Sequence, residues 1–410
     1  MTSTALHTDQ YELTMLDAAL RAGAEGPRVT FEVFVRHLPP GRRYGVFAGL
    51  ERLLDAIDEF CFGPDEVGWL REQRIISEQA LAWLGNFRFG GDIHAYREGE
   101  LYTDGSPVLT VEGTFGESVL LETLILSILN HDSSVAAGAS MIVEAAGDRP
   151  VIDMGSRRTD TEAAVAAARA GYLAGLAATS NLEAGRRYGV PTAGTAAHAF
   201  VLLFPDERAA FAAQVAAFGA GTTLVVDTFD TDEAIRRAVE VAGTSLAAIR
   251  IDSGDLAEEA WRARAVLDSL GATETKIMVT GDLDEASIRG LAGCPADGYG
   301  AGTSVAMGLG FPTAGFVYKL VAVEGRAVAK RSPGKATTGG RKWAWRVADN
   351  AEEVVALSRD CAPPGGRSLQ ESVVAGGRRL PGPSLAESRA FHQRVMAELG
   401  PGRSLDLVRA

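Results

Sequence analysis

The stretch Ala248-Ile249-Arg250-Ile251-Asp252-Ser253-Gly254-Asp255 decides the fold class. Its first four residues predict a short buried β-strand, and the polar residues after them predict an abrupt turn at the end of that strand. An α/β barrel presents its reacting groups at the C-terminal ends of its parallel strands. A strand that ends in two carboxylates and a hydroxyl group therefore predicts a ligand site in a protein of this class.

The same succession of a short apolar run and a polar end recurs through the middle of the chain. Strands are predicted at residues 151–154, 173–178, 191–193, 223–226, 248–251, 276–279 and 298–300. Helices are predicted between them at residues 160–170, 182–188, 206–219, 232–242, 256–270 and 284–292. Alternation of short strands and longer helices predicts a parallel sheet. Because no GxGxxG fingerprint occurs, the pattern favours an incomplete, irregular α/β barrel over an open dinucleotide-binding sheet.

The composition is that of an ordinary globular protein of 410 residues, long enough for two or three domains. The net charge of −13 gives no general attraction to nucleic acid or to an anionic membrane, so an anionic substrate needs a local basic site. Cys61, Cys294 and Cys361 are widely spaced and form no CxxC motif, which predicts reduced thiols and a cytoplasmic location. Neither a signal peptide nor a membrane-spanning segment is predicted.

The segments on either side of the βα region predict a different architecture. Residues 1–115 combine short helices with alternating strands, which is typical of an antiparallel sheet with one open face. After residue 312 the βα alternation stops, and antiparallel strands precede a basic loop and a last helix over residues 384–399. The chain is therefore predicted to divide into segments 1–115, 116–312 and 313–410, with the active site in the middle segment.

Polar residues follow every predicted strand of the middle segment, and a barrel would gather them at one mouth. Arginine forks bind phosphates, carboxylates hold ribose hydroxyls or Mg²⁺, and a Gly/Thr turn holds a phosphate on its backbone N–H groups. Together they predict a site for a ligand that carries phosphates and vicinal hydroxyls. The candidate residues are Arg157, Arg158, Thr179, Ser180, His198, Asp227, Asp252, Gly281, Asp282, Gly300, Ala301, Gly302 and Thr303.

Each of these features has a simpler explanation when it is taken alone. The glycine-rich turn can be a plain loop, and Arg157-Arg158 can be a solvated pair. Asp227 and Asp252 can be helix caps, and His198 can be a structural histidine. Their recurrence at successive strand ends is what favours a shared site.

Several long motifs occur in a fixed order from residue 8 to about residue 346. They are Thr8-Asp9-Gln10-Tyr11-Glu12-Leu13-Thr14-Met15, Phe31-Glu32-Val33-Phe34, Leu121-Glu122-Thr123-Leu124, Gly155-Ser156-Arg157-Arg158, Thr179-Ser180-Asn181, Gly194-Thr195-Ala196-Ala197-His198-Ala199-Phe200, Val226-Asp227-Thr228, Ile251-Asp252-Ser253-Gly254-Asp255 and Lys330-Arg331-Ser332-Pro333-Gly334-Lys335.

In these motifs the chain resembles the nicotinate phosphoribosyltransferase family. The resemblance implies a type II phosphoribosyltransferase fold, an irregular α/β barrel with an α+β domain built from both chain ends, working as a dimer. It also implies that nicotinate and phosphoribosyl pyrophosphate react to nicotinate mononucleotide and pyrophosphate, coupled to ATP hydrolysis, in NAD biosynthesis.

The resemblance implies roles in catalysis for a few of these residues. His198 resembles the histidine that ATP phosphorylates. Arg250 resembles an arginine that contacts the base and the phosphates, and Asp252 resembles a carboxylate on the ribose side. Asp227 and Asp252 together are expected to hold Mg²⁺. The implied cofactor is thus Mg²⁺, with ATP as a co-substrate.

Other residues are implied to bind the substrates. Tyr11 resembles an aromatic side chain that stacks on the pyridine ring from the neighbouring subunit of a homodimer. Met154 stands where relatives often carry a second stacking aromatic side chain, so a sulfur–aromatic contact is expected there instead. The remaining implied contacts are Arg157 to the base and phosphates, Asp282 to the ribose, Gly300-Ala301-Gly302-Thr303 to the 5′-phosphate, and Thr179, Ser180 and Gly281 within the substrate site.

Three other functions compete with this one. The same fold can use nicotinamide, but relatives that prefer the amide tend to carry Asp where this chain has Ser180, whose hydroxyl can donate to a carboxylate. A nucleic-acid-binding module would use the basic and aromatic residues between Lys330 and Arg346, and the net charge of −13 opposes it. A non-catalytic metabolite sensor is disfavoured because His198, Asp227 and Asp252 are all present. No nucleic acid or membrane partner is expected.

Overall fold

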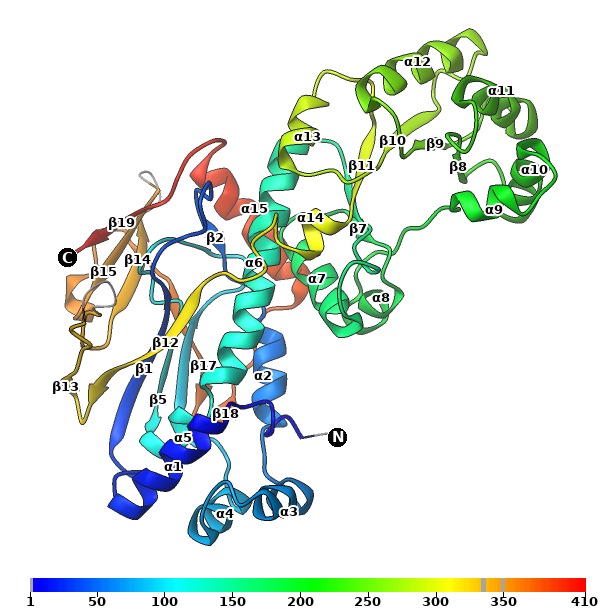
Figure 1. The fold of residues 1–410 in the computed structure, drawn as a ribbon. Helices are drawn as coiled ribbons and strands as arrows, with labels where there is room; N and C mark the ends of the chain where they lie inside the picture. Colours follow the sequence, from blue (N-terminus) through cyan, green and yellow to red (C-terminus); the bar gives the residue numbers. More distant parts are fainter. Residues whose placement is uncertain (1–2, 333–336, 348–350) are drawn as a thin grey trace. The chain divides into compact units, whose positions relative to one another are not determined.

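A computed structural model describes residues 3–332, 337–347 and 351–410. The chain forms two compact units, one from Met1–Ala137 and Phe311–Ala410 and the other from Gly138–Gly310 (Figure 1). Helix α6 (Glu122–Ala146) therefore belongs to both units, and the first division falls inside it rather than near residue 115. The reason is that the first part of α6 buries Leu124, Ile125 and Leu129 in the apolar core of the first unit.

The second unit is built on a curled sheet of six parallel strands, which confirms the irregular parallel α/β barrel predicted from the sequence. Strands β7 and β8 are the two ends of the sheet order and are not paired with each other, so the barrel is half closed. The strand order is β7 (Ala178–Thr179), β6 (Val151–Asp153), β11 (Gly298–Ala301), β10 (Lys276–Val279), β9 (Ala248–Ile251) and β8 (Thr223–Val225).

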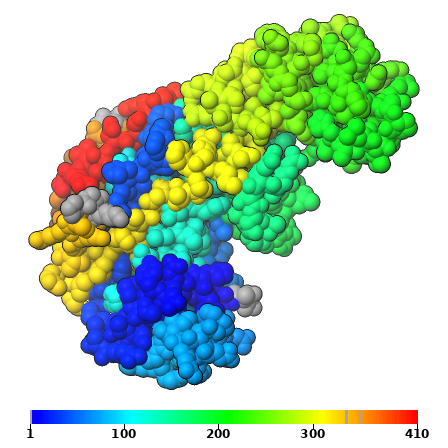
Figure 2. Space-filling view, viewed as in Figure 1, coloured from blue at the N-terminus to red at the C-terminus, as the bar shows by residue number. Residues whose placement is uncertain are grey.

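Eight helices of the second unit follow its strands or connect them, within the described residues. Helices α10, α11 and α12 pack side by side, and their atoms form the green surface of this unit in Figure 2. Aspartate side chains begin five of the helices by accepting backbone N–H groups, which is why a carboxylate follows so many strands. The helices are α7 (Thr161–Leu173), α8 (Leu182–Tyr188), α9 (His198–Leu202), α10 (Glu207–Phe218), α11 (Thr231–Ala242), α12 (Leu256–Ser269), α13 (Glu285–Gly290) and α14 (Thr303–Ala306).

Two predicted strands are wrong. The run 173–178 begins as helix, because α7 continues to the buried Leu173, and the chain then turns at Gly175, where φ is +116°. Only β7 remains of this strand. The run 191–193 makes a single isolated bridge between Thr179 and Thr192, in keeping with the N–H group that Pro191 lacks.

The first unit contains an antiparallel sheet in which both ends of the chain take part, which confirms the predicted α+β domain. Strand β12 pairs with β1, and β17 pairs with β3, so strands of the C-terminal segment flank the three N-terminal strands on both sides. The strand order is β13 (Arg326–Ala327), β12 (Phe316–Val323), β1 (Arg28–Val35), β5 (Leu109–Thr114), β3 (Asp92–Tyr96), β17 (Gln370–Ala375) and β18 (Arg378–Arg379).

Smaller sheets and seven further helical segments complete the described part of the first unit. Its four-stranded sheet is β16 (Arg367–Ser368), β14 (Trp343–Val347), β15 (Glu352–Ala356) and β19 (Asp406–Arg409), and its two-stranded ribbon is β2 (Gly45–Val46) with β4 (Leu101–Tyr102). The helical segments are α1 (Gln10–Ala22), α2 (Leu50–Asp58), α3 (Pro64–Gln73), α4 (Glu78–Gly85), α5 (Phe115–Val119), the 3₁₀ turn η2 (Arg359–Cys361) and α15 (Leu385–Leu399).

One predicted motif cannot be followed to its end in the structure. Residues 333–335 of the motif that begins at Lys330 lie outside the described residues.

Throughout the described ranges, every helix is too short or too polar to cross a membrane.

Candidate active site

The ends of β8 and β9 and the start of α9 bring together one histidine and two carboxylates. The Nε2 atom of His198 lies 3.8 Å from Oδ1 of Asp227 and 3.8 Å from Oδ2 of Asp252. The other ring nitrogen, Nδ1, is 3.0 Å from the hydroxyl oxygen of Thr228. The imidazole therefore turns one nitrogen to a hydroxyl group and the other to a pair of carboxylates.

Asp227 is the most buried member of this group, with 4% of its side chain exposed. Its Oδ2 atom accepts the backbone N–H of Asp252 at 2.8 Å and the hydroxyl of Ser253 at 2.7 Å. Its Oδ1 atom is buried and has no hydrogen-bond partner among the described residues. A buried carboxylate oxygen without a donor is costly, so this corner of the site suits a cation.

Arg250 projects from β9, and its guanidinium is held at several points. Its Nε–H donates to the hydroxyl of Thr280 at 3.1 Å, and its Nη1 donates to the hydroxyl of Thr195 at 3.0 Å. Its Nη2 lies 3.4 Å from Oδ1 of Asp252. Because only 12% of the side chain is exposed, Arg250 is a preorganised positive charge at the mouth of the sheet.

The ends of β6 and β7 meet through a buried carboxylate, Asp153. It accepts the hydroxyl of Thr179 at 2.6 Å and the backbone N–H of Gly155 at 2.8 Å. Burial raises the pKa of Asp153, and these two hydrogen bonds oppose the rise. The backbone N–H of Ser180 donates to the carbonyl of Asp153 at 2.8 Å, and the hydroxyl oxygens of Ser180 and Ser156 lie 3.3 Å apart. Two hydroxyl groups are thus available side by side beyond the end of β7.

Glycines near the ends of β10 and β11 permit close approach of the backbone. A Cβ atom on Gly300 would lie 2.7 Å from the sulfur of Met154 and 2.6 Å from the methyl group of Thr280. The Met154 side chain therefore packs directly against the backbone of β11 at Gly300. Any larger residue at position 300 would displace the Met154 side chain. Gly281 has φ of +111°, and a Cβ atom there would lie 2.5 Å from the carbonyl oxygen of Asp252.

The remaining predicted residues lie in three places. Ala301 ends β11, Gly302 is the N-cap of α14, and Thr303 is its first residue. Asp282 is exposed and has φ of +47°, and its Oδ1 atom lies 3.9 Å from Nη2 of Arg158. Arg157 is also exposed. Tyr11 belongs to α1 in the first unit, where 44% of it is exposed.

Six side chains that contact the proposed site residues have no individual role assigned in the sequence analysis. Five of them carry hydroxyl groups and lie in the polar segments after the strands or beside His198, so the strand-end pattern includes them without giving them a role. Asp153 falls inside its predicted strand, since nothing local separates a buried polar residue from an exposed one. The six are Asp153, Ser156, Thr195, Thr228, Ser253 and Thr280.

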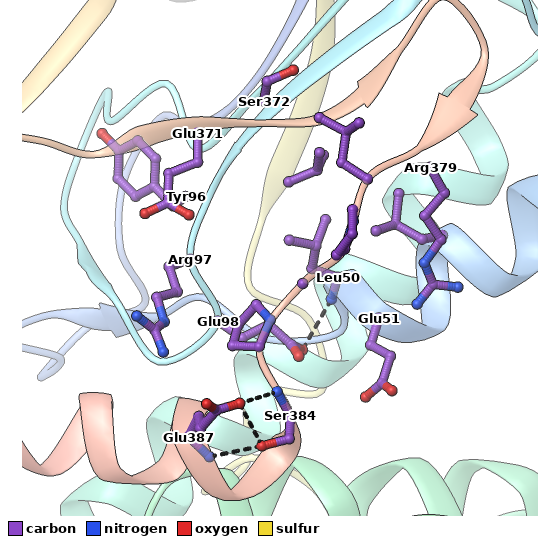
Figure 3. Close-up of a pocket in the computed structure, with 16 residues that line it drawn as sticks. Leu50, Glu51, Tyr96, Arg97, Glu98, Glu371, Ser372, Arg379, Ser384 and Glu387 are labelled. Atoms are coloured by element: carbon purple, nitrogen blue, oxygen red, sulfur yellow. Dashed lines mark hydrogen bonds between the residues drawn. The ribbon is translucent and has the colours of Figure 1, made fainter.

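A separate pocket of about 360 Å³ lies in the first unit (Figure 3). Its lining carries Glu98, Glu387 and Arg379, which already have local partners. Glu98 accepts the backbone N–H groups of Gly49 and Leu50, Glu387 closes the capping box of α15, and Arg379 pairs with Asp55. These charges stabilise the surrounding elements of the first unit.

Comparison with known proteins gives one consistent result. Residues 6–130 match the family model of the nicotinate phosphoribosyltransferase (NAPRTase) N-terminal domain. The chain is 51% identical to a nicotinate phosphoribosyltransferase of Mycobacterium tuberculosis, over 98% of this chain and 92% of that protein. It is 36% identical to the nicotinate phosphoribosyltransferase of Bacillus subtilis, over 84% and 73% of the two chains. The crystal structure of human nicotinic acid phosphoribosyltransferase superposes with a TM-score of 0.84 at 27% identity, over 98% of this chain and 97% of that one.

Proposed function

The chain belongs to the nicotinate phosphoribosyltransferase family, and we propose that the strand ends of its half-barrel carry out this reaction with the residues described above. The enzyme joins nicotinate to phosphoribosyl pyrophosphate in NAD biosynthesis. The observation that carries the proposed site is the arrangement of His198, Asp227, Asp252 and Arg250 around one edge of the sheet.

Glycosyl transfer of this kind needs charge stabilisation and positioning more than proton transfer. Pyrophosphate leaves the anomeric carbon of the ribose as positive charge develops on the ring, and the pyridine nitrogen attacks that carbon. We assign Arg250 and Arg157 to the phosphates and the base, and Asp252 and Asp282 to the ribose hydroxyls. Preorganised charges lower such a barrier because they need not reorient during the reaction, and the three-point support of Arg250 fits this role.

The phosphate and base ends of the substrates are assigned to neighbouring parts of the sheet mouth, at the ends of β11 and of β6 and β7. Residues 300–303 are proposed to hold the 5′-phosphate on backbone N–H groups, with Gly281 leaving room beside them. Met154 and Thr179 are proposed to line the base. The hydroxyl of Ser180, beside that of Ser156, can donate to the nicotinate carboxylate, whereas an aspartate there would repel it. This arrangement supports nicotinate over nicotinamide.

Magnesium is proposed to bind at Asp227 and Asp252. The partnerless buried oxygen of Asp227 fits a cation, although the described residues hold no cluster of three or more metal-ligating side chains. Two carboxylates suffice for Mg²⁺ because it usually keeps several waters and takes substrate phosphates as further ligands. When bound, the ion would neutralise charge on the departing pyrophosphate. The chain's own part is to keep Oδ1 of Asp227 clear of hydrogen-bond donors, within the described residues, while Oδ2 is held by Asp252 and Ser253.

ATP is proposed as the co-substrate that phosphorylates His198. With Nδ1 directed to Thr228, the Nε2 atom is the nitrogen open to a phosphoryl group. A neutral imidazole is a competent phosphoryl acceptor near pH 7. The added phosphate would place negative charge beside Arg250 and the carboxylates and alter how they hold the substrates.

The assembly and location are also proposals. We propose a homodimer in which Tyr11 stacks on the pyridine ring bound by the partner subunit. The exposure of Tyr11 on the first unit supports this proposal, because the ring is open to contact with a second subunit. A cytoplasmic location is supported by the scattered cysteines, which form no disulfide with one another.

A label-transfer assay tests the proposed function. Purified protein is given phosphoribosyl pyrophosphate with labelled nicotinate or labelled nicotinamide, with and without ATP and Mg²⁺. The expected product is labelled nicotinate mononucleotide, formed faster with ATP, with little product from nicotinamide. Asp252→Asn should abolish most of the activity, and Asp406→Asn, on β19 in the first unit, is the matched control. Equal use of both bases, or full activity of Asp252→Asn, would refute the assignment.

A further inference from the structure

Thr280 stands directly after β10 and is almost completely buried, with 2% of the residue exposed. Its backbone N–H donates to the carbonyl of Ile251 at 2.9 Å, which fixes it against β9. Its hydroxyl contacts both Arg250 and Asp252, and its methyl group packs on Gly300. One small side chain therefore touches three of the residues assigned to substrate binding.

The direction of these hydrogen bonds follows from the chemistry of the partners. The Nε–H of Arg250 can only donate, so the hydroxyl oxygen of Thr280 accepts it at 3.1 Å. The single hydroxyl proton then goes to a carboxylate, and Oδ1 of Asp252 is the nearest acceptor. The carbonyl oxygen of Ile251, at 3.4 Å, is a poorer alternative. The result is a chain from the guanidinium through the hydroxyl to the carboxylate.

This series of hydrogen bonds leaves one oxygen of the Asp252 carboxylate facing His198. Oδ1 is engaged by Thr280 and lies 3.4 Å from Nη2 of Arg250. Oδ2 is the oxygen that faces Nε2 of His198 at 3.8 Å. A half-turn of the carboxylate only exchanges two equivalent oxygens, but a partial turn would break the contact with Thr280, so the hydroxyl fixes the plane of the carboxylate and the position of the guanidinium.

We propose that Thr280 is a positioning residue for phosphoribosyl transfer, which locks Arg250 and Asp252 in the orientation that receives phosphoribosyl pyrophosphate. The inference rests on the proposed function of those two residues. Thr280 needs no contact with the substrates, because its effect passes through the two charges that it orders. Groups that orient such charges commonly change activity 10- to 100-fold when they are lost, and we expect an effect of about that size here.

The hydroxyl group and the methyl group of Thr280 can be removed one at a time, which gives a matched pair of variants. Thr280→Val keeps the shape and the methyl contact with Gly300 but removes the hydroxyl. Thr280→Ser keeps the hydroxyl and removes the methyl group. If ordering by the hydroxyl is what matters, the serine variant retains activity and the valine variant loses it, although serine disturbs the packing more.

The experiment measures kcat and KM for both substrates in the two variants, with thermal unfolding as the check on folding. We expect Thr280→Val to lower kcat/KM for phosphoribosyl pyrophosphate by about 10- to 100-fold, with a smaller change in KM for nicotinate. Thr280→Ser should stay within about threefold of the wild type. If Thr280→Val unfolds early, Thr280→Cys replaces it and is compared with Thr280→Ser, since the two side chains differ only in the sulfur that takes the place of the hydroxyl oxygen and is a weak donor.

The outcomes separate this inference from the proposed function. An active wild type, an inactive Asp252→Asn and a fully active Thr280→Val would overturn the role of Thr280 alone. Equal losses in Thr280→Ser and Thr280→Val, or a cysteine variant as active as the serine one, would show that packing rather than the hydroxyl matters and would also overturn it. A wild type without transferase activity, or a fully active Asp252→Asn, would remove the proposed function itself.

Discussion

The Nε2 atom of His198 lies 3.8 Å from Oδ1 of Asp227, a buried carboxylate oxygen that has no hydrogen-bond partner among the described residues. If the Nδ1–H group donates to Thr228, the lone pair of Nε2 points to the carboxylate side of the site. Two electron-rich groups face each other there, and a cation held by Asp227 and Asp252 would relieve their repulsion.

The first prediction follows from this geometry and concerns phosphorylation. Incubation with γ-labelled ATP should place acid-labile, base-stable label on the wild type and none on His198→Asn. The variant should lose ATP hydrolysis but keep slow, ATP-independent synthesis of nicotinate mononucleotide, because the phosphate is proposed to tighten substrate binding and not to perform the transfer. A His198→Asn variant that keeps full ATP-stimulated activity would show that His198 is a structural residue.

The second prediction concerns the choice of base. Ser180→Asp should raise KM for nicotinate at least about tenfold and change KM for phosphoribosyl pyrophosphate far less, because only nicotinate meets a new like charge. Ser180→Ala is the control, since it removes the donor without adding charge, and it should show a smaller effect on the same constant. Equal losses for both substrates in Ser180→Asp would place Ser180 away from the pyridine carboxylate.

The third prediction concerns assembly. Tyr11 is 44% exposed on α1, so the face of its ring is open to stacking on a pyridine ring, and burial of part of the residue beside Glu122 raises the pKa of its hydroxyl further above the ordinary value of 10. Tyr11→Ala and Asp252→Asn should each be inactive alone and should recover activity when mixed, because one of the two sites in a mixed dimer would then be intact. Verified heterodimers without activity would indicate that each site is built from one chain.

The fourth prediction concerns the stability of the first unit. Glu12 is fully buried and accepts the backbone N–H of Thr123 at 2.9 Å and the Thr123 hydroxyl at 2.5 Å. Burial raises the pKa of Glu12 to about 7 from an ordinary value of 4.5. The folded state therefore binds this proton more tightly than the unfolded state. The resulting stabilisation is complete below the unfolded pKa and is lost as the pH rises through about 7.

The variant Glu12→Gln should remove this dependence, because glutamine is neutral at every pH. Between pH 5.5 and 8.5 the wild type should lose about 1–3 kcal/mol of unfolding free energy relative to the variant. Urea denaturation followed by tryptophan fluorescence is the measurement, since Trp69, Trp83, Trp343 and Trp345, four of the five tryptophans, belong to the first unit. Parallel stability curves for the two proteins would mean that Glu12 does not titrate in this range.

The local pattern of the sequence was sufficient to predict the positions of most helices and strands of the second unit. Strands β9 and β10 and helix α8 have the predicted bounds, because each is a compact apolar or amphipathic run between polar turns. The capped start of α15 at Ser384 was equally local, since Glu387 closes its capping box within one turn. The run 173–178 was misjudged because an alanine-rich apolar segment can continue a helix as easily as begin a strand.

By itself, the sequence determined that the chain alternates strands with helices, that polar groups follow the strands, and which family the motifs indicate. Tertiary structure alone decided the order β7-β6-β11-β10-β9-β8, which sets β9 between β8 and β10 and so brings Asp252 against both Asp227 and Thr280. It also decided that β12 from the C-terminal segment completes the sheet of β1. Strand pairing between distant segments depends on the packing of the whole unit, and so does the burial that leaves one oxygen of Asp227 without a donor among the residues that the structure describes. No local run of residues records either of them.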